Sequence, residues 1–396
     1  MSGPLKGIKV LDLSRILAGP TATQLLGDLG AEVIKIENPV TAGDDTRSWG
    51  PPFALDASGA PTDLSAYFMC ANRNKKSVAI DISTKAGQKQ VKLLAENADI
   101  IVENFKPGAL RKYGLDYGTM LEAFPRLVYC SISGFGQTGP NSSKPGYDLM
   151  AQGYGGIMSL TGAPDGEPMK VGVGVADVMC GMYATVGILA ALRHRDHTGE
   201  GQHIDLALVD TQVAWLVNQG VNYLTSGKVP ERHGNGHPNI APYQVFRALD
   251  GDVIVAVGND TQFQRFAHWL GVADLATDPM FATNPARLEN RDALTSLLEP
   301  LIIRHSVQAV LDGLEAGNVP VGPVNTLDTV FASDQVAARE MKITMTTGAE
   351  ADQTVDLIGN PLKFSKTPVS YRRAPPTFGQ HTAEVLDTLS NHSGPP

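Results

Sequence analysis

The sequence has few cysteines and no long run of basic residues. Its three cysteines, Cys70, Cys130 and Cys180, lie far apart and form no CxxC pair. This spacing excludes a zinc site built from cysteines and indicates a reducing compartment. The formal net charge is −9, and no Lys/Arg block is present. We therefore expect neither nucleic acid nor an anionic membrane surface as a partner.

The first residues show no targeting signal. The stretch MSGPLKGIKVLDLS has neither the apolar core of a secretory signal peptide nor an apolar run long enough to span a bilayer. We expect a cytoplasmic protein, or a mitochondrial or peroxisomal one if the source is eukaryotic. The 396 residues are 42% hydrophobic and 18% charged, as in ordinary globular proteins, and they suffice for one large domain and a smaller one.

The first half of the chain alternates short β-branched runs with helical stretches. Strands are predicted at residues 8–13, 31–37, 78–82, 99–103 and 127–133, and helices at 20–29 and 84–97. This alternation predicts βαβ units and a mainly parallel, doubly wound sheet. An apolar run from Val178 to Arg195 predicts a buried central helix that begins at Asp177.

The composition changes near residue 226. The segment SGKVPERHGNGHPNIAPY is polar and rich in Gly and Pro, which predicts a loop or a domain connection. Beyond it we predict a hairpin with an Asp-Gly turn in FRALDGDVIVAVG, and helices at 260–270, 290–305 and 306–316, with Pro300 kinking or breaking the second. The predicted domains are a large one at 1–225 and 329–396 and a small α/β one at 226–328.

Gly134 to Gly139 match the GxGxxG spacing of dinucleotide-binding loops, but their context differs. Pro140 and a polar stretch follow where an apolar helix is required, and no acidic residue ends a following strand about twenty positions on. We interpret the glycines as a loop that shapes the wall of a pocket, and we disfavour a nicotinamide oxidoreductase.

Asp177 is the most informative single residue. At the start of a helix it is either an N-cap or a carboxylate that the helix dipole keeps ionised. The small residues around it, VGVGVADVMCG, leave room for a bulky ligand, and an ionised carboxylate with open approach is a nucleophile for an acyl carbon. The two interpretations are compatible, and the N–H groups that begin the helix are expected to stabilise oxyanions.

Two polar segments leave alternatives open. His233 and His237 flank Gly234-Asn235-Gly236, which is either an interdomain turn or a flexible loop that closes over a site. The run NRNKKS at residues 72–77 concentrates three cations, either as a solvated loop or as a clamp for phosphate or carboxylate. No histidine pair has the spacing of metal ligands, and we predict no metal site.

Motifs along almost the whole chain resemble those of one family. In order they are LDLSRILAGPTATQLLGDLGAEVIKIE, AGDDTR, NRNKKS, VENFKPG, SGFGQTGP, GYDLMAQ, VAD, TGEGQHIDLALVD, PVGPVN and GQHT. The set is similar to that of the class III CoA-transferases, which include formyl-CoA transferase and, as a divergent branch, alpha-methylacyl-CoA racemase. GDDTRSWGPPF and NRNKKS are similar to the branch that contains succinyl-CoA:glutarate CoA-transferase.

The resemblance implies a fold and an activity. The fold is a Rossmann-like large domain built from both chain ends, with a small central domain and an interlaced homodimer of ring-shaped subunits. The activity is transfer of coenzyme A from an acyl-CoA, here succinyl-CoA, to a carboxylic and in this branch dicarboxylic acid. Acyl-CoA and acid are substrates, and no permanently bound cofactor is implied.

The resemblance also assigns roles to residues. The catalytic aspartate falls on Asp177. The CoA-contacting positions fall on Arg15, Ile16, Leu17, Ala18, Asn104 and Lys112. Formyl-CoA transferase has arginine in place of Lys112 and of Asn38, and glutamine in place of Leu17. These departures argue against formyl-CoA and oxalate as substrates.

One position separates transfer from racemisation. The racemases place a histidine before the Asp of a GHD motif as one of two acid/base groups, and here that position is Tyr147. A tyrosine, with a solution pKa of about 10, is a poor base at neutral pH. We therefore expect transfer, with an alpha-methylacyl-CoA racemase and a non-catalytic CoA-binding protein as alternatives.

The expected mechanism places two covalent intermediates on Asp177, a mixed anhydride and then an aspartyl-CoA thioester. Residues 233–238 are expected to close as a lid that excludes water. The distal carboxylate of a dicarboxylic acid requires a cation, and we expect Arg73 first and Arg47 second because both lie in motifs shared with the glutarate-type branch.

Overall fold

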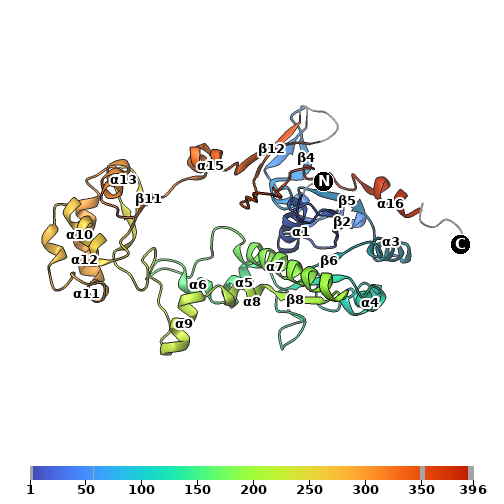
Figure 1. Ribbon diagram of the computed structural model, residues 1–396, viewed down its shortest axis with the longest axis horizontal. Helices are drawn as coiled ribbons and strands as arrows, with labels where there is room; N and C mark the ends of the chain where they lie inside the picture. Colours follow the sequence, from blue (N-terminus) through green and yellow to red (C-terminus); the bar gives the residue numbers. More distant parts are fainter. Residues whose placement is uncertain (1–2, 57, 348–352, 391–396) are drawn as a thin grey trace. The chain divides into compact units, whose positions relative to one another are not determined.

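The computed structural model describes residues 3–56, 58–347 and 353–390 (Figure 1). Two compact units can be distinguished along the chain. The larger takes residues 1–157, 170–227 and 335–396, and the smaller takes 158–169 and 228–334. The larger unit therefore draws on both chain ends. The sequence did not predict that residues 158–169 leave the larger unit for the smaller one.

A six-stranded sheet in which every pairing is parallel forms the centre of the larger unit. Its order is β5-β2-β1-β6-β7-β8. In that order the strands span Lys75–Ala79, Glu32–Glu37, Lys9–Asp12, Ile100–Glu103, Val128–Ser133 and His203–Ala207. The predicted parallel α/β sheet is confirmed. The chain reverses its direction of winding between β1 and β6, and loops that diverge at such a switch point leave a crevice.

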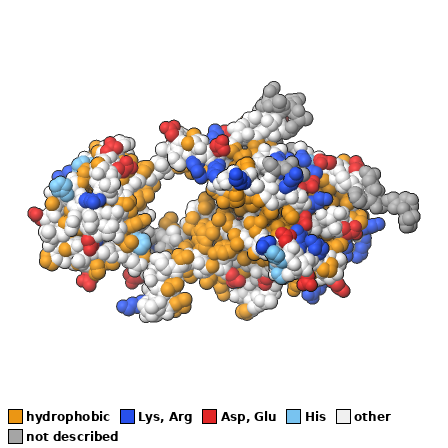
Figure 2. Space-filling model, viewed as in Figure 1, with side chains coloured by type: hydrophobic (Ala, Val, Ile, Leu, Met, Phe, Trp, Pro, Cys, Tyr) orange, Lys and Arg blue, Asp and Glu red, His pale blue; other side chains and the backbone are white. Residues whose placement is uncertain are grey.

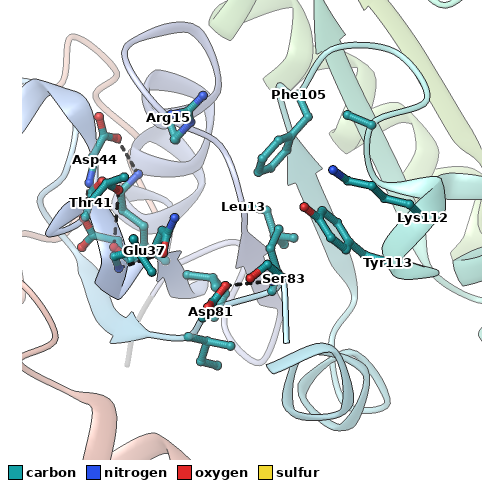
Figure 3. A pocket seen from close by; sticks show the side chains of 18 residues that line it. Leu13, Arg15, Glu37, Thr41, Asp44, Asp81, Ser83, Phe105, Lys112 and Tyr113 are labelled. Atoms are coloured by element: carbon teal, nitrogen blue, oxygen red, sulfur yellow. Dashed lines mark hydrogen bonds and ion pairs between the residues drawn. The ribbon is translucent and has the colours of Figure 1, made fainter. Parts of the chain in front are cut away.

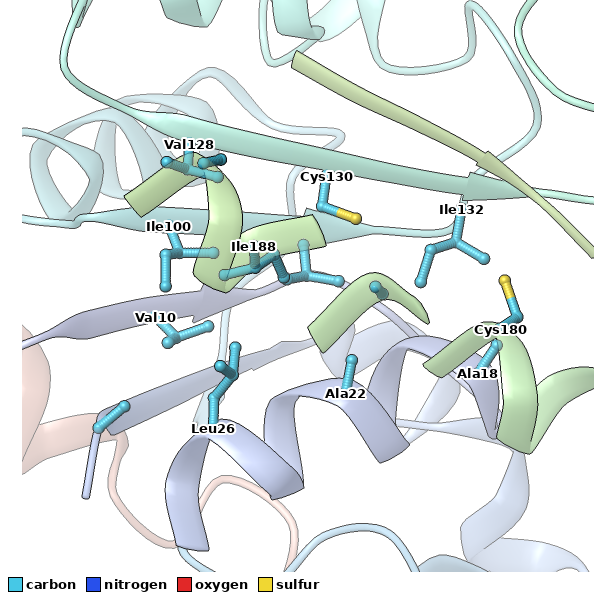
Figure 4. Packing of buried hydrophobic residues seen from close by; sticks show 14 of the residues in the cluster. Val10, Ala18, Ala22, Leu26, Ile100, Val128, Cys130, Ile132, Cys180 and Ile188 are labelled. Carbon is cyan, nitrogen blue, oxygen red and sulfur yellow. The ribbon is translucent and has the colours of Figure 1, made fainter. Parts of the chain in front are cut away.

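Helices cover both faces of this sheet because alternate strand residues point to opposite sides. Val10, Ile100 and Val128 face one side, where they form a core with two helices (Figure 4). Those two helices are α1 (Ala18–Asp28) and α7 (Val175–Thr198). The helices on the other side are α3 (Lys85–Ala95), α4 (Tyr117–Ala123) and α16 (Thr382–Ser390).

Helix α7 is only partly buried. By length and composition it is apolar enough to cross a membrane, but half of its most apolar window is buried inside the protein. Cys180, Ala184 and Ile188 pack into the core against the sheet, and a core helix passes the same test. Met182 and Val186 are exposed, so the predicted buried central helix is buried on one side only in the single chain.

Strand β5 begins three residues before the predicted strand at 78–82. In the sequence its first residues, Lys75 and Lys76, belong to the run predicted as either a solvated loop or a clamp for phosphate or carboxylate. In the structure the ammonium of Lys75 is buried and lies 3.0 Å from the carboxylate of Asp12 in β1. The strand starts early because partners on neighbouring segments neutralise its lysines.

The C-terminal segment bonds to the residues just before β5. The side-chain amide of Asn74 donates to the carbonyl of Ser370 and accepts from the N–H of Arg372. The guanidinium of Arg73 donates to the carbonyl of Ile358 at 2.8 Å. Segments almost 300 residues apart in sequence thus share partly buried hydrogen bonds.

The larger unit contains further short elements. They are β3 (Phe53–Leu55), β4 (Pro61–Ser65), α2 (Ala66–Met69), α5 (Asp148–Tyr154), α8 (Leu208–Ala214), α9 (Val217–Ser226), α15 (Asp334–Ala338), β12 (Lys342–Thr346) and β13 (Thr354–Ile358), with α6 (Ile157–Leu160) at the boundary between the units. Strands β3–β4 and β12–β13 form antiparallel pairs.

The smaller unit combines an antiparallel sheet, ordered β11-β10-β9, with helices. Its strands are β9 (Tyr243–Arg247), β10 (Asp252–Ala256) and β11 (Val321–Pro323). Its helices include α10 (Asp260–Trp269), α11 (Asn284–Glu289), α12 (Arg291–Ile302), α13 (Val307–Ala316) and α14 (Leu327–Ala332). The predicted hairpin is confirmed, because Arg247 pairs with Asp252 across the turn that contains Asp250 and Gly251. Pro300 lies inside α12, which ends at Ile302.

Candidate functional site

Two cavities open where β1 and β6 diverge. The larger, of about 420 Å³, lies between Arg15, Thr41 and Asp44 on one side and Phe105, Lys112 and Tyr113 on the other (Figure 3). The smaller, of about 200 Å³, is lined by the turn after β1, the segment after β6, a glycine-rich loop and Asp177. Arg15 and Phe105 line both cavities. The two cavities therefore adjoin, with Lys112 at one end and Asp177 at the other.

Asp177 is the third residue of α7 rather than its N-cap. The N-cap is Gly174, which has no side chain to cap the helix. The carboxylate of Asp148, in α5, accepts from the N–H of Ala176 at 2.8 Å and from that of Asp177 at 3.3 Å. The N-cap interpretation of Asp177 is therefore wrong, because a side chain from another helix caps α7.

The carboxyl of Asp177 is buried, and its pKa is raised. Burial raises that pKa from 3.8 to about 7, and the negative charge of Asp148 adds to the effect. Within the described part of the chain, no side chain donates a hydrogen bond to this carboxyl group. The predicted stabilisation of its charge by the helix N-terminus is contradicted, since Asp148 occupies the N–H groups that would supply it.

The same contacts contradict the predicted oxyanion site. The N–H groups of Ala176 and Asp177 bond to Asp148, and that of Val178 bonds to the carbonyl of Gly174 at 3.0 Å. A donor already bonded in this way is not available to a developing oxyanion. Donors for that charge therefore have to come from another part of the site.

Glycines bring two loops of the cavity wall into contact. A Cβ on Gly134 would lie 2.4 Å from the Cα of Gly146, so neither position has room for a side chain. Both glycines and Tyr147 line the cavity that contains Asp177. This geometry supports the interpretation of the GxGxxG match as a pocket wall.

Tyr67 is electrostatically coupled to Asp177, which the sequence did not indicate. Burial raises its pKa to about 12, and the negative charge of Asp177 is the next cause. The phenol therefore stays protonated at neutral pH. Its ring meets that of Trp49 edge to face, with centroids 5.1 Å apart. The sequence carried no signal for this placement, because α2 has only four residues and lies far from Asp177 in the chain.

The predicted CoA-contacting residues lie along the two cavities. Arg15, Ile16, Leu17, Ala18 and Asn104 line the Asp177 cavity, and Lys112 lines the larger one. The amide of Asn104 accepts from the N–H of Arg15 at 2.8 Å and donates to its carbonyl at 2.7 Å. The guanidinium of Arg15 pairs with Asp45 and lies 5.8 Å from the ring centre of Phe105.

Arg47 and Arg73 do not face either cavity, which contradicts their predicted role at a distal carboxylate. Arg47 is buried, forms two hydrogen bonds to Glu37, and lies over the ring of Phe68 at 3.7 Å. Arg73 is buried and forms two hydrogen bonds to Asp28. Both guanidinium groups are therefore occupied by structural partners. The cations that do line the Asp177 cavity are Arg15, Lys106 and Lys144.

The residues of the predicted lid belong to the smaller unit. His233, Asn235 and Gly236 line a cavity of about 700 Å³ there, and Gly234 has a positive φ of 56°. The carbonyl of His237 accepts from Arg291 at 2.6 Å, and its N–H donates to the carbonyl of Tyr243. The loop is thus anchored within its own unit, and its closure over a site stays a prediction.

Three comparisons with known proteins identify the same family of relatives over almost the whole chain. The model of a family described as CoA-transferase family III matches residues 5–382. A succinate–glutarate CoA-transferase of Agrobacterium fabrum is 46% identical over 386 residues, which cover 98% of this chain and 96% of the relative. A succinyl-CoA:glutarate CoA-transferase of Homo sapiens is 41% identical over 97% of this chain and 85% of the relative. The crystal structure of a CaiB/BaiF family protein from Brucella suis has a TM-score of 0.88 and 48% identity, covering 98% of this chain and all of that one.

Proposed function

The chain belongs to CoA-transferase family III, and on that premise we propose that it moves coenzyme A from succinyl-CoA to a dicarboxylic acid through covalent intermediates on Asp177. Transfer of CoA between an acyl-CoA and a carboxylate is the activity of the family. The identity of the two acids and the route through Asp177 are what we propose beyond this family activity. The observation that carries the route is a buried carboxyl at one end of two adjoining cavities.

The cavities suggest how an acyl-CoA binds. We place the thioester beside Asp177 and the nucleotide part in the larger cavity. There Lys112 supplies positive charge for a phosphate, and Phe105 and Tyr113 supply aromatic surface. Arg15, which lines both cavities, lies between the two parts of the ligand.

The proposed chemistry begins with an ionised Asp177. Its oxygen attacks the acyl carbon of succinyl-CoA, so the C–S bond breaks and the product is a mixed anhydride with free CoA thiolate. The thiolate then attacks the aspartyl carbonyl carbon, which releases succinate and leaves an aspartyl-CoA thioester. The acceptor carboxylate attacks that thioester, and the returning thiolate takes the new acyl group and frees Asp177.

Burial of Asp177 supports this route. An anhydride open to water is lost to hydrolysis, and a desolvated carboxylate is a stronger nucleophile than a hydrated one. The side chain is only 9% exposed. The protonated phenol of Tyr67, whose pKa the charge of Asp177 helps to raise, is a candidate donor for the oxyanion in place of the occupied helix N–H groups.

The preference for dicarboxylic acids rests on the relatives. Both of those described above carry glutarate in their names, together with succinate or succinyl-CoA. With Arg47 and Arg73 in structural ion pairs, a distal carboxylate would be met by one of the cations that line the Asp177 cavity, namely Arg15, Lys106 or Lys144.

We also propose that the chain acts as an interlaced homodimer. The single chain exposes a large apolar surface, and Figure 2 shows hydrophobic side chains gathered over the region where α5, α7 and α8 lie in Figure 1. Exposed members include Leu149, Met150, Met182, Tyr183 and Val186. Exposed apolar side chains gathered in this way mark an interface with another chain in soluble proteins. A single-chain mass in sedimentation at micromolar concentration would contradict this proposal.

Among the described residues, the Asp177 cavity gives the racemase alternative no support. Tyr147 lines that cavity at the position where the racemases place a histidine.

Intact-protein mass spectrometry tests the proposal. Wild type and Asp177→Asn, which keeps the shape of the side chain, are mixed with succinyl-CoA, and one sample of each is then treated with hydroxylamine. We expect an adduct of CoA mass less one water on the wild type alone, and its loss with hydroxylamine.

Acceptors are then compared in a matched pair. Glutarate and pentanoate have the same chain length and differ in the distal carboxylate. We expect glutarate to discharge the adduct and to appear as glutaryl-CoA. An adduct that persists on Asp177→Asn would refute the role of Asp177, and equal discharge by pentanoate would refute the dicarboxylate preference.

A further inference from the structure

The turn after β1, residues 14–17, has a strained backbone at the wall of the Asp177 cavity. Ile16 has a φ of 70°, in the left-handed region that a β-branched residue rarely enters. Its N–H donates to both carboxylate oxygens of Asp44, each at 3.2 Å. Asp44 is buried and lies 28 residues further along the chain. A side chain from another segment therefore holds the strained residue.

Lys35, in β2, holds the same turn from a second direction. Its ammonium forms an ion pair with Asp44 at 2.9 Å and donates to the carbonyl of Ser14 at 2.8 Å. The two side chains of the pair are 1% and 0% exposed. Lys35 thus links Asp44, which binds Ile16, to Ser14, which lies two positions before Ile16.

The amide of Asn104 completes the arrangement through its two hydrogen bonds to Arg15. The main chain of three consecutive residues is therefore bonded to side chains from three other segments. One consequence concerns the ligand. The N–H groups of Arg15 and Ile16 are occupied, so these two donors are not available to a ligand.

We propose that Asp44 and Lys35 are positioning residues for acyl-CoA, which hold the turn in the strained conformation that keeps Arg15 between the two cavities and Leu17 in the wall beside Asp177. The inference rests on the CoA transfer proposed above. Without the pair, Ile16 relaxes to a negative φ, and the turn withdraws both side chains from the cavity wall.

The location of the pair supports positioning rather than stability as its role. A buried ion pair is a weak source of stability, because taking two charges out of water costs about as much as their attraction provides. Strained residues persist where their surroundings over-determine them, and they cluster at active sites. The pair between Arg73 and Asp28 is a matched comparison, with an N–O distance of 2.6 Å and exposures of 5% and 0%. It bonds to the C-terminal segment and does not touch the turn.

Steady-state kinetics of Asp44→Asn and of the control Asp28→Asn test the inference. We expect Asp44→Asn to raise the KM for succinyl-CoA about tenfold, the scale of the penalty for a left-handed residue, and to change the KM for glutarate by less than twofold. Asp28→Asn is expected to lower the melting temperature and to leave both KM values within twofold. If circular dichroism shows that Asp44→Asn does not fold, Asp44→Glu replaces it in the same kinetic comparison. Glutamate keeps the charge but displaces the carboxylate oxygens from the N–H of Ile16.

A double-mutant cycle with Ile16→Gly separates positioning from general damage. Glycine adopts a positive φ without strain, so in the Ile16→Gly background the substitution at Asp44 should raise the KM for succinyl-CoA less than threefold. An equal increase in both backgrounds, or an equal effect of Asp28→Asn, would overturn the inference. A wild type that forms no CoA adduct would instead refute the proposed function, so the two failures are distinguishable.

Discussion

Asp177 has to lose its proton before it can attack an acyl carbon, and in this protein that loss falls near neutral pH. Its pKa is about 7, against 3.8 for an ordinary aspartate. Burial is the first cause and the charge of Asp148 the second. The group is inactive as a nucleophile when protonated below that pKa and active when ionised above it.

The size of the effect follows from the ionised fraction. With a pKa of about 7, about one tenth of Asp177 is ionised at pH 6 and about nine tenths at pH 8. We therefore expect the kcat/KM for succinyl-CoA to rise about tenfold between these two values, since this parameter reports the free enzyme. An aspartate with the ordinary pKa would be fully ionised at both values and would give a flat profile.

The substitution Asp148→Asn refines the prediction. It removes the negative charge beside Asp177 and keeps an oxygen for the N–H of Ala176. We expect the pKa of Asp177 to fall, so that the inflection moves to lower pH and the ratio of rates at pH 8 and pH 6 drops below tenfold.

The assay is the rate of CoA-adduct formation at succinyl-CoA well below its KM, followed by mass spectrometry from pH 5 to 9. Asp177→Ala, which lacks the carboxylate, shows at each pH how much adduct signal and how much loss of succinyl-CoA arise without Asp177. A profile that is flat from pH 6 to 8, or an inflection that Asp148→Asn leaves in place, would refute the electrostatic reasoning.

Two further predictions concern other parts of the site. Lys112→Met removes the cation at the far end of the larger cavity; in steady-state kinetics the KM for succinyl-CoA should rise about five- to tenfold with kcat unchanged, and an unaltered KM would contradict the proposed orientation of CoA. Gly134→Ala places a methyl group 2.4 Å from the Cα of Gly146. The loops must then separate, at a cost of about 1–3 kcal/mol, so melting temperature and adduct formation should both fall. Wild-type values for both would refute the close contact.

The sequence predicted those strands that contain a short apolar run. Strands β1, β2, β6 and β7 were expected because each contains apolar, partly β-branched residues between the helical stretches. Strand β8 was not, because it pairs only with β7 at the edge of the sheet and carries a half-buried His203 and an exposed Asp205. An edge strand of this composition does not stand out from a polar loop.

The site was predicted less completely, because the role of a charged residue depends on its partner. Arg73 reads as part of a basic loop, and only the fold shows Asp28, 45 residues earlier in the chain, beside it. Asp177 was recognised from its motif, yet its raised pKa depends on Asp148, 29 residues before it. No spacing in the sequence indicates that α5 meets the start of α7.

The hydrogen bonds between the segment before β5 and the C-terminal residues have a consequence for synthesis on the ribosome. The buried amide of Asn74 donates to Asp28, but its other partners, Ser370, Arg372 and Arg373, lie near the end of the chain. An emerging chain that lacks them would bury unsatisfied polar groups, so the larger unit cannot close until translation is almost complete. The smaller unit, mostly residues 228–334, is already outside by then. We therefore expect the middle of this protein to fold before its beginning.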